Sequence, residues 1–150
     1  MKQLIFLAFS VLAALPAFSQ TKTLQNLDRH GVAIQGYDPV AFFTDGKPVK
    51  GKPEFSSQSD GGTYHFASAE HKSLFDQDPG KYQPMFGGYC AYGVSRNHLV
   101  PVDVDAFQIV DGHLILQYSK SVRDTFNKDR AGNLSKASSN WPALVEKNAK

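Results

Sequence analysis

The chain has 150 residues, which suits one ordinary domain and is short for two. Its 16 basic and 14 acidic residues give a net charge of +2 with neutral histidines, and this balance favours neither nucleic acid nor an anionic membrane as a partner. The single cysteine, Cys90, excludes an internal disulfide. Packing must therefore hold the fold, and 11 Phe, 6 Tyr and 1 Trp can supply the apolar area.

The first residues have the pattern of a secretory leader. Lys2 precedes an apolar run from Leu4 to Phe18, which Pro16 interrupts and which ends in small residues. A membrane anchor would need about 20 continuous apolar residues. We therefore interpret residues 1–19 as a signal peptide cleaved after Ser19, and expect a periplasmic or secreted product without a membrane anchor.

Residues 20–30 are polar and are predicted to form a flexible arm before a domain that covers 31–145. Two short apolar runs, Val32–Ile34 and Val40–Phe43, flank the turn signal Gly36–Pro39. Lys50–Gly62 is interpreted as a polar connection.

A strand followed by a helix is predicted next. Residues 63–67 alternate between polar and apolar types, as a half-buried strand does. Ser68 is a good helix N-cap and Glu70 suits the first turn, so we expect a helix that runs to about Gln77 and ends at Asp78-Pro79-Gly80.

The second half contains the clearest hairpin signal and a helical pattern. Apolar runs at 107–110 and 114–118 flank Asp111-Gly112-His113. Apolar residues then recur at helical spacing from Val122 to Trp141 and stop at Pro142, which predicts one bent helix or two short ones. The fold class expected is α+β, a small antiparallel sheet with hairpins packed against a short central helix and a C-terminal helix.

Two histidines lie at the predicted junction of strand and helix. His65 would lie on the strand face opposite Tyr64 and Phe66, and His71 would lie on or beside the core face of the helix. Each could be a hydrogen-bonded core residue or a metal ligand, and the sequence leaves both interpretations open.

Cys90 adds a third candidate ligand. It lies in the glycine-rich stretch 86–93, whose composition suits close backbone approach better than a regular helix. A free thiol in an oxidising compartment must be buried, bound or functional. One thiolate and two imidazoles suit copper, with zinc as the alternative, so Cys90, His65 and His71 are the candidate metal ligands.

The ordered motifs resemble a known family. Tyr64–Ser68, Asp78–Tyr82 and Gly87–Ala91, with Gly36–Ala41 upstream and Asn140-Trp141-Pro142 at the end, are similar to the secreted branch of the YHS-domain proteins. That resemblance implies a small α+β domain and a metal-binding module. The family's metal-transport members carry paired cysteines, which this chain lacks, so metal binding here would need other ligands.

Three functions are compatible with these residues. The first is an exported metal-binding protein that acts as a carrier, buffer or sensor, most simply for copper, with the metal ion and an envelope protein as partners. The second is a non-catalytic structural or interaction module that keeps the fold without metal. The third is an enzyme with Cys90 as nucleophile, which ranks last because no catalytic signature or resolving thiol lies near it.

Overall fold

The structure is a computed structural model, and it describes residues 21–149. The predicted signal peptide, residues 1–19, lies outside the described residues. In chain order the elements are η1 (Ile34–Gly36), α1 (Ala41–Thr44), β1 (Lys52–Ser59), β2 (Gly62–Phe66), α2 (Ala69–Gln77), α3 (Pro79–Tyr82), η2 (Met85–Gly88), α4 (Ala91–Ser95), β3 (Asp103–Val110), β4 (His113–Gln117), α5 (Lys120–Asn127) and α6 (Arg130–Asn148), where η marks a 3-10 helix.

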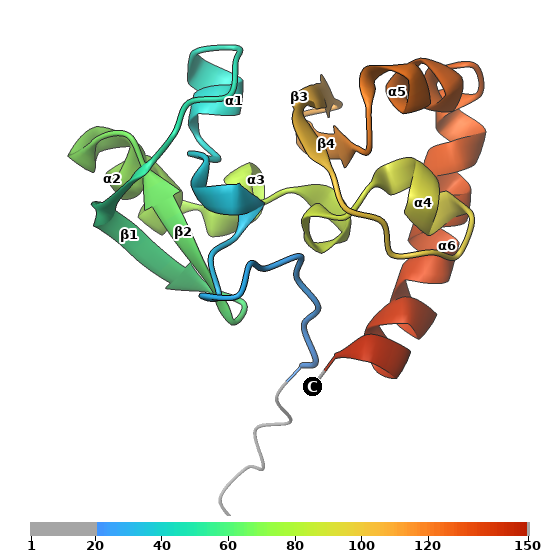
Figure 1. Ribbon diagram of the computed structural model, residues 1–150, viewed down its shortest axis with the longest axis horizontal. Coiled ribbons are helices and arrows are strands. Elements are labelled where there is room, and N and C mark those ends of the chain that lie inside the picture. Colours follow the sequence, from blue (N-terminus) through green and yellow to red (C-terminus); the bar gives the residue numbers. More distant parts are fainter. Residues whose placement is uncertain (1–20, 150) are drawn as a thin grey trace, which may run out of the picture.

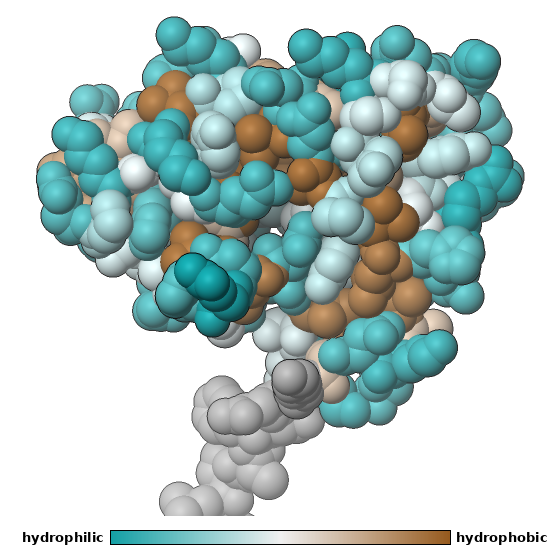
Figure 2. All heavy atoms as spheres, viewed as in Figure 1, coloured by the Kyte–Doolittle hydropathy of each residue, from teal (hydrophilic) through white to brown (hydrophobic). Residues whose placement is uncertain are grey.

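The α+β class is confirmed, with the strands divided between two halves of the molecule. One half contains the β1–β2 hairpin with α1, α2 and α3, and the other contains the β3–β4 hairpin with α4, α5 and α6 (Figure 1). On the face drawn in Figure 2, the largest group of hydrophobic side chains lies on the half that contains α4 and α6, and smaller groups lie between the halves. Among residues 21–149, every helix is too short or too polar to cross a bilayer.

The first hairpin corrects one prediction. The segment Lys52–Ser59, interpreted above as a connection, is strand β1 and pairs antiparallel with β2. The residues of β1 do not show the apolar alternation of a half-buried strand, because β1 has one neighbouring strand and no fully buried residue. The predicted strand is present as β2, and the predicted helix is present as α2, with the Ser68 hydroxyl accepting from the His71 N–H at 3.1 Å.

The second hairpin forms where the sequence predicts it. Strands β3 and β4 pair antiparallel around Asp111 and Gly112, whose φ angles of 50° and 77° suit a tight turn between twisted strands. Alternation along β4 divides its side chains between two cores. Leu114 and Leu116 belong to the first, and Ile115 belongs to the second.

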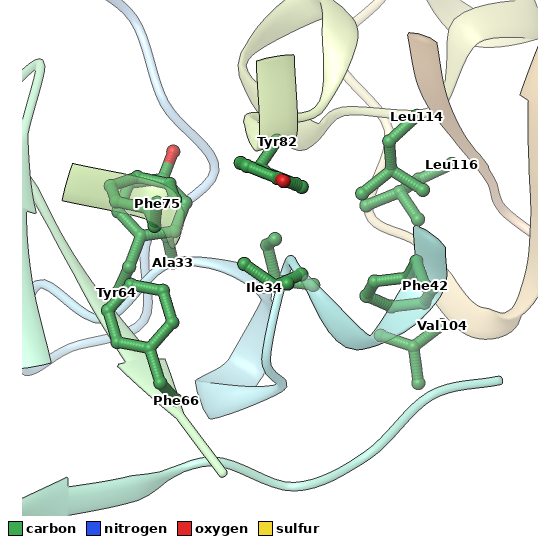
Figure 3. Packing of buried hydrophobic residues seen from close by; sticks show 11 residues of the cluster. Ala33, Ile34, Phe42, Tyr64, Phe66, Phe75, Tyr82, Val104, Leu114 and Leu116 are labelled. Atoms are coloured by element: carbon green, nitrogen blue, oxygen red, sulfur yellow. The ribbon is translucent and has the colours of Figure 1, made fainter. Parts of the chain in front are cut away.

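The first core joins both hairpins. Ile34 and Tyr82 lie between an aromatic group from β2 and α2 and a mixed group in which Phe42 packs with the aliphatic side chains Val104, Leu114 and Leu116 (Figure 3). Phe75 is 1% exposed, and its ring centroid is 4.9 Å from that of Tyr64. The second core consists of Phe86, Ala91, Val94, Val110, Ile115, Phe126, Ala137 and Leu144.

The C-terminal pattern is two helices, α5 and α6, and Pro142 lies inside the second. The expectation that Pro142 ends the helix is wrong. A proline inside a helix loses one hydrogen bond and crowds the preceding turn, at a cost of about 3 kcal/mol. Tertiary packing offsets this cost, because Trp141 contacts Phe86 edge-on at 6.0 Å between ring centroids and Leu144 is buried.

The segment 21–30, part of the predicted arm, lies along the domain. The Asn26 N–H donates to the Gly87 carbonyl at 2.8 Å, and a Cβ on Gly87 would lie 2.0 Å from the Leu24 carbonyl oxygen. The close backbone approach expected of the glycine-rich stretch is therefore present, although α4 also makes part of that stretch helical. The flexibility of this segment stays a prediction.

Truncation of either core should destabilise the whole domain. Phe75→Ala and Phe126→Ala each remove a ring that is at most 1% exposed, and each should lower the free energy of unfolding by about 3–5 kcal/mol. Because β4 contributes to both cores, urea unfolding followed by fluorescence and far-UV circular dichroism should show one coincident transition. Separate transitions for the two halves would contradict this account.

The buried phenol of Tyr64 should make stability depend on alkaline pH. Burial raises the pKa of Tyr64, whose hydroxyl donates to Gln25 Oε1 at 2.8 Å. Its contribution is fully present below the pKa of the unfolded phenol, about 10, and is lost as pH rises above it, because the unfolded chain ionises first. Urea titrations between pH 8 and 11 should show a steeper loss for the parent than for Tyr64→Phe. Equal slopes would mean that the phenol is accessible in the folded state.

Candidate functional site

His71 is held by the first turn of α2. Ser68 caps this helix and fixes the backbone of His71, and the imidazole Nδ1 lies 2.6 Å from Asp38 Oδ2. The histidine side chain is 16% exposed and the aspartate side chain is fully buried. A contact of this length between a ring nitrogen and a carboxylate is a strong, charge-assisted hydrogen bond.

Asp38 accepts four hydrogen bonds from three segments of the chain. Its Oδ1 accepts from the backbone N–H groups of Val40 at 2.8 Å and Ala41 at 3.3 Å, as an aspartate before a turn commonly does. Its Oδ2 accepts from the Ala67 N–H at 2.8 Å and from His71. The carboxylate therefore joins the start of α1, the end of β2 and the first turn of α2.

This arrangement determines which nitrogen of His71 is free. Because a carboxylate can only accept, Nδ1 carries the proton. The other nitrogen, Nε2, lies 3.4 Å from the Thr44 hydroxyl at the end of α1. The Thr44 hydroxyl has one proton, which it donates to Asp45 Oδ1 at 2.9 Å, so it is not a strong donor to Nε2. A carboxylate behind the ring is also the arrangement that orients metal-binding histidines.

His65 lies elsewhere, on the face of β2 away from the core. Its neighbours Tyr64 and Phe66 are buried and it is half-buried, as the alternation predicts. Gly51 crosses directly over it, since a Cβ there would lie 2.5 Å from the His65 carbonyl carbon. The imidazole lines an open cavity together with His30 and Lys50.

Cys90 is buried, 1% exposed, at the N-cap of α4. The thiol donates to Gln117 Oε1 at 3.3 Å, and the Gly93 N–H donates weakly to the sulfur at 3.5 Å. Gln117 is itself fully buried and also accepts from the Tyr92 N–H. The thiol therefore belongs to the packing of the second half.

The structure does not bring Cys90, His65 and His71 together. Each has its own surroundings, and residues 21–149 contain no group of three or more His, Cys, Asp or Glu side chains placed to hold a metal ion. The partners that sequence reasoning missed are Asp38 for His71 and Gln117 for Cys90. The Asp38-Pro39 pair in the sequence indicates an aspartate that caps a turn. No local pattern indicates that Asp38 also contacts His71, 33 positions away.

Loss of Asp38 should be among the most damaging single changes. Asp38→Ala leaves buried donors without their acceptor and should lower the free energy of unfolding by about 3–5 kcal/mol. His71→Ala leaves Asp38 with its backbone donors and should cost about 1.5–3 kcal/mol. The double variant should cost less than the sum, because the two side chains contact each other.

The control for these variants is Asp45→Ala. Asp45 is exposed and accepts from Thr44, so its loss should change the free energy of unfolding by no more than about 0.5 kcal/mol. Urea denaturation of the four variants beside the parent supplies the measurement. Strict additivity of Asp38→Ala and His71→Ala would show that the contact contributes nothing to folding.

The comparisons with known proteins assign no family to this chain. No family model, curated protein or solved structure matches the chain. The resemblance to YHS-domain proteins stays a prediction from the motifs described above.

Proposed function

We propose that this protein is an exported, non-catalytic binding module in which the pair formed by Asp38 and His71 maintains the fold. The observation that carries the proposal is the fully buried Asp38 carboxylate, which accepts the His71 Nδ1–H and three backbone N–H groups. Removal of one partner from such a buried network leaves polar groups unsatisfied, which accounts for a histidine at this position on structural grounds.

The surroundings of Cys90 support the same proposal. A nucleophilic thiol needs a base within hydrogen-bond distance and access for substrate. Cys90 instead contacts an amide oxygen and a backbone N–H, and it is 1% exposed. Metal binding through this sulfur would require the opening of a packed core, so the thiol is better explained as a small buried side chain.

Metal carriage is the second candidate, favoured by Nε2 of His71, whose contact with the Thr44 hydroxyl is long, at 3.4 Å. Asp38 orients the imidazole from behind and leaves Nε2 on the partly exposed side, as outer carboxylates do for histidines that bind copper or zinc. A single histidine is an incomplete site for either ion. This function, as carrier, buffer or sensor, would need the missing ligands from an envelope protein partner or a second chain.

The two candidates predict different results in a metal titration. Purified mature protein, kept reduced, is titrated with Cu(I) and Zn(II) against a chromogenic chelator, beside His71→Ala and Cys90→Ser. The proposed module should show no one-to-one complex with a Kd below about 1 μM. Thermal stability in excess chelator should equal that of the untreated sample, because no metal supports the fold.

His113→Ala provides the matched control, since His113 is exposed at the β3–β4 turn. Any weak metal uptake by single surface histidines should fall equally in His71→Ala and His113→Ala. A tight complex that is lost in His71→Ala and kept in His113→Ala would overturn the proposal and establish the second candidate.

A further inference from the structure

A cavity of about 380 Å³ opens beside the β1–β2 hairpin, away from the contact between Asp38 and His71. It is lined by Asp28, His30, Val32, Gln35, Gly36, Lys50, Gly51, Pro53 and His65. Its volume falls within the range of small-molecule sites, about 300–1,000 Å³. Basic and imidazole groups from three separate segments line this cavity, whose remaining surface, with Val32 and Pro53, is mostly apolar.

Backbone pairing positions the two central side chains of this cavity. Tyr37 and Lys50 form an antiparallel bridge, and the Gly51 N–H donates to the Gly36 carbonyl at 2.9 Å. His65 is carried by β2 directly beneath Gly51. These side chains therefore extend from a paired backbone rather than from a free loop, which keeps their separation defined.

The space beside Gly36 lies between an ammonium and an imidazole. A Cβ on Gly36 would be 3.5 Å from Lys50 Nζ and 3.6 Å from His65 Nδ1. Gly36 is buried and has a φ of +81°, which disfavours any other residue, so no side chain from this position separates the two nitrogens. Lys50 Nζ and His65 Nδ1 therefore lie close together at the wall of the cavity, so one anionic group in the cavity can contact both.

Lys50 has hydrogen-bonding capacity left for such a ligand. Its ammonium donates to the Gln35 carbonyl and lies 4.6 Å from the centroid of the Tyr37 ring. An ammonium has three donors, and one is used in this contact. The remaining donors, together with the positive charge, suit an anionic oxygen.

His30 can supply a further donor. Its Nε2 accepts from Arg29 Nε at 3.0 Å, so in the neutral ring Nδ1 carries the proton. Arg29 also adds a positive charge next to the cavity. The lining residue of opposite charge is Asp28, whose Oδ1 accepts from the backbone N–H groups of His30 and Val32.

One oxygen of Asp28, Oδ1, is occupied by its own loop. The hydrogen bond from the Val32 N–H lowers the pKa of Asp28, so this carboxylate is ionised at neutral pH. The negative charge of Asp28 opposes an anion in the cavity, although its Oδ1 already accepts hydrogen bonds from two backbone N–H groups. With Lys50, Arg29 and two imidazoles nearby, the balance of charge and of donors favours an anionic ligand.

We propose that this cavity binds a small anion of the carboxylate or phosphate class, with Lys50 and His65 as its principal donors and His30 at its rim. The inference rests on the proposed function, because it names the ligand class of a non-catalytic binding module. It assigns His65 to ligand recognition, whereas His71 remains a structural residue.

The test is a titration of ¹⁵N-labelled mature protein with inorganic phosphate and, separately, with succinate. Ionic strength is held constant with sodium chloride, and a metal chelator is present throughout. Backbone amide shifts of Gly36, Gly51 and His65 should move saturably for at least one probe, with a Kd of about 1 mM or tighter. Saturation by phosphate alone or by succinate alone identifies the source of the anionic group.

Variants that change one charge test whether the anion binds in this cavity. Lys50→Gln should weaken binding by about tenfold, the loss expected for one charge-assisted hydrogen bond. Asp28→Asn keeps the Oδ1 acceptor of its loop and removes the opposing charge, so binding should strengthen. Lys47→Gln, at an exposed turn, removes the same charge outside the cavity and should leave the affinity within about twofold.

Three results would overturn the inference: no saturable shift with either probe, equal weakening by Lys50→Gln and Lys47→Gln, or weaker binding in Asp28→Asn. If the spectrum of Lys50→Gln shows an unfolded chain, His65→Gln decides in its place, with the same expected weakening. A negative result in this titration would not contradict the proposed function, because that proposal is contradicted only by a tight metal complex that depends on His71.

Discussion

The burial of one carboxylate, Asp38, is the constraint on which the first half of the structure depends. An ionised carboxylate removed from water needs hydrogen bonds to its oxygens. Val40 and Ala41 donate to one oxygen, and Ala67 and His71 donate to the other. Because these donors come from α1, the end of β2 and α2, all three elements must meet at the same point.

The turn that contains Asp38 also connects the structural residue His71 to the proposed binding cavity. The Asp38 N–H donates to the Val49 carbonyl, and this pairing continues to Lys50 and Gly51, which lie over His65. The turn thus places Asp38 against His71 and pairs with Lys50, which lines an open cavity together with His65 from β2. Two histidines that look equivalent in the sequence have different environments and, in our proposals, different roles.

Local signals in the sequence predict local structure, and the errors concern contacts between distant segments. Ser68 predicts the start of α2 because the backbone N–H three residues later needs an acceptor, which the hydroxyl supplies. Asp111-Gly112 predicts the second hairpin because the turn needs positive φ angles. The sequence of β1 does not predict a strand, because its residues are polar and their extended conformation depends on pairing with β2. Helix α6 continues through Pro142 because packing outweighs propensity, and no local pattern joins Asp38 to His71.

The most direct test of the central claim is the tautomer of His71 by long-range ¹H–¹⁵N correlation in mature protein at neutral pH. If the carboxylate holds the ring, Nδ1 carries the proton and Nε2 has the shift of an unprotonated nitrogen, and both shifts stay unchanged when one equivalent of Cu(I) or Zn(II) is added. A proton on Nε2 alone, or a large change of the Nε2 shift with metal, would contradict the account and make His71 a ligand.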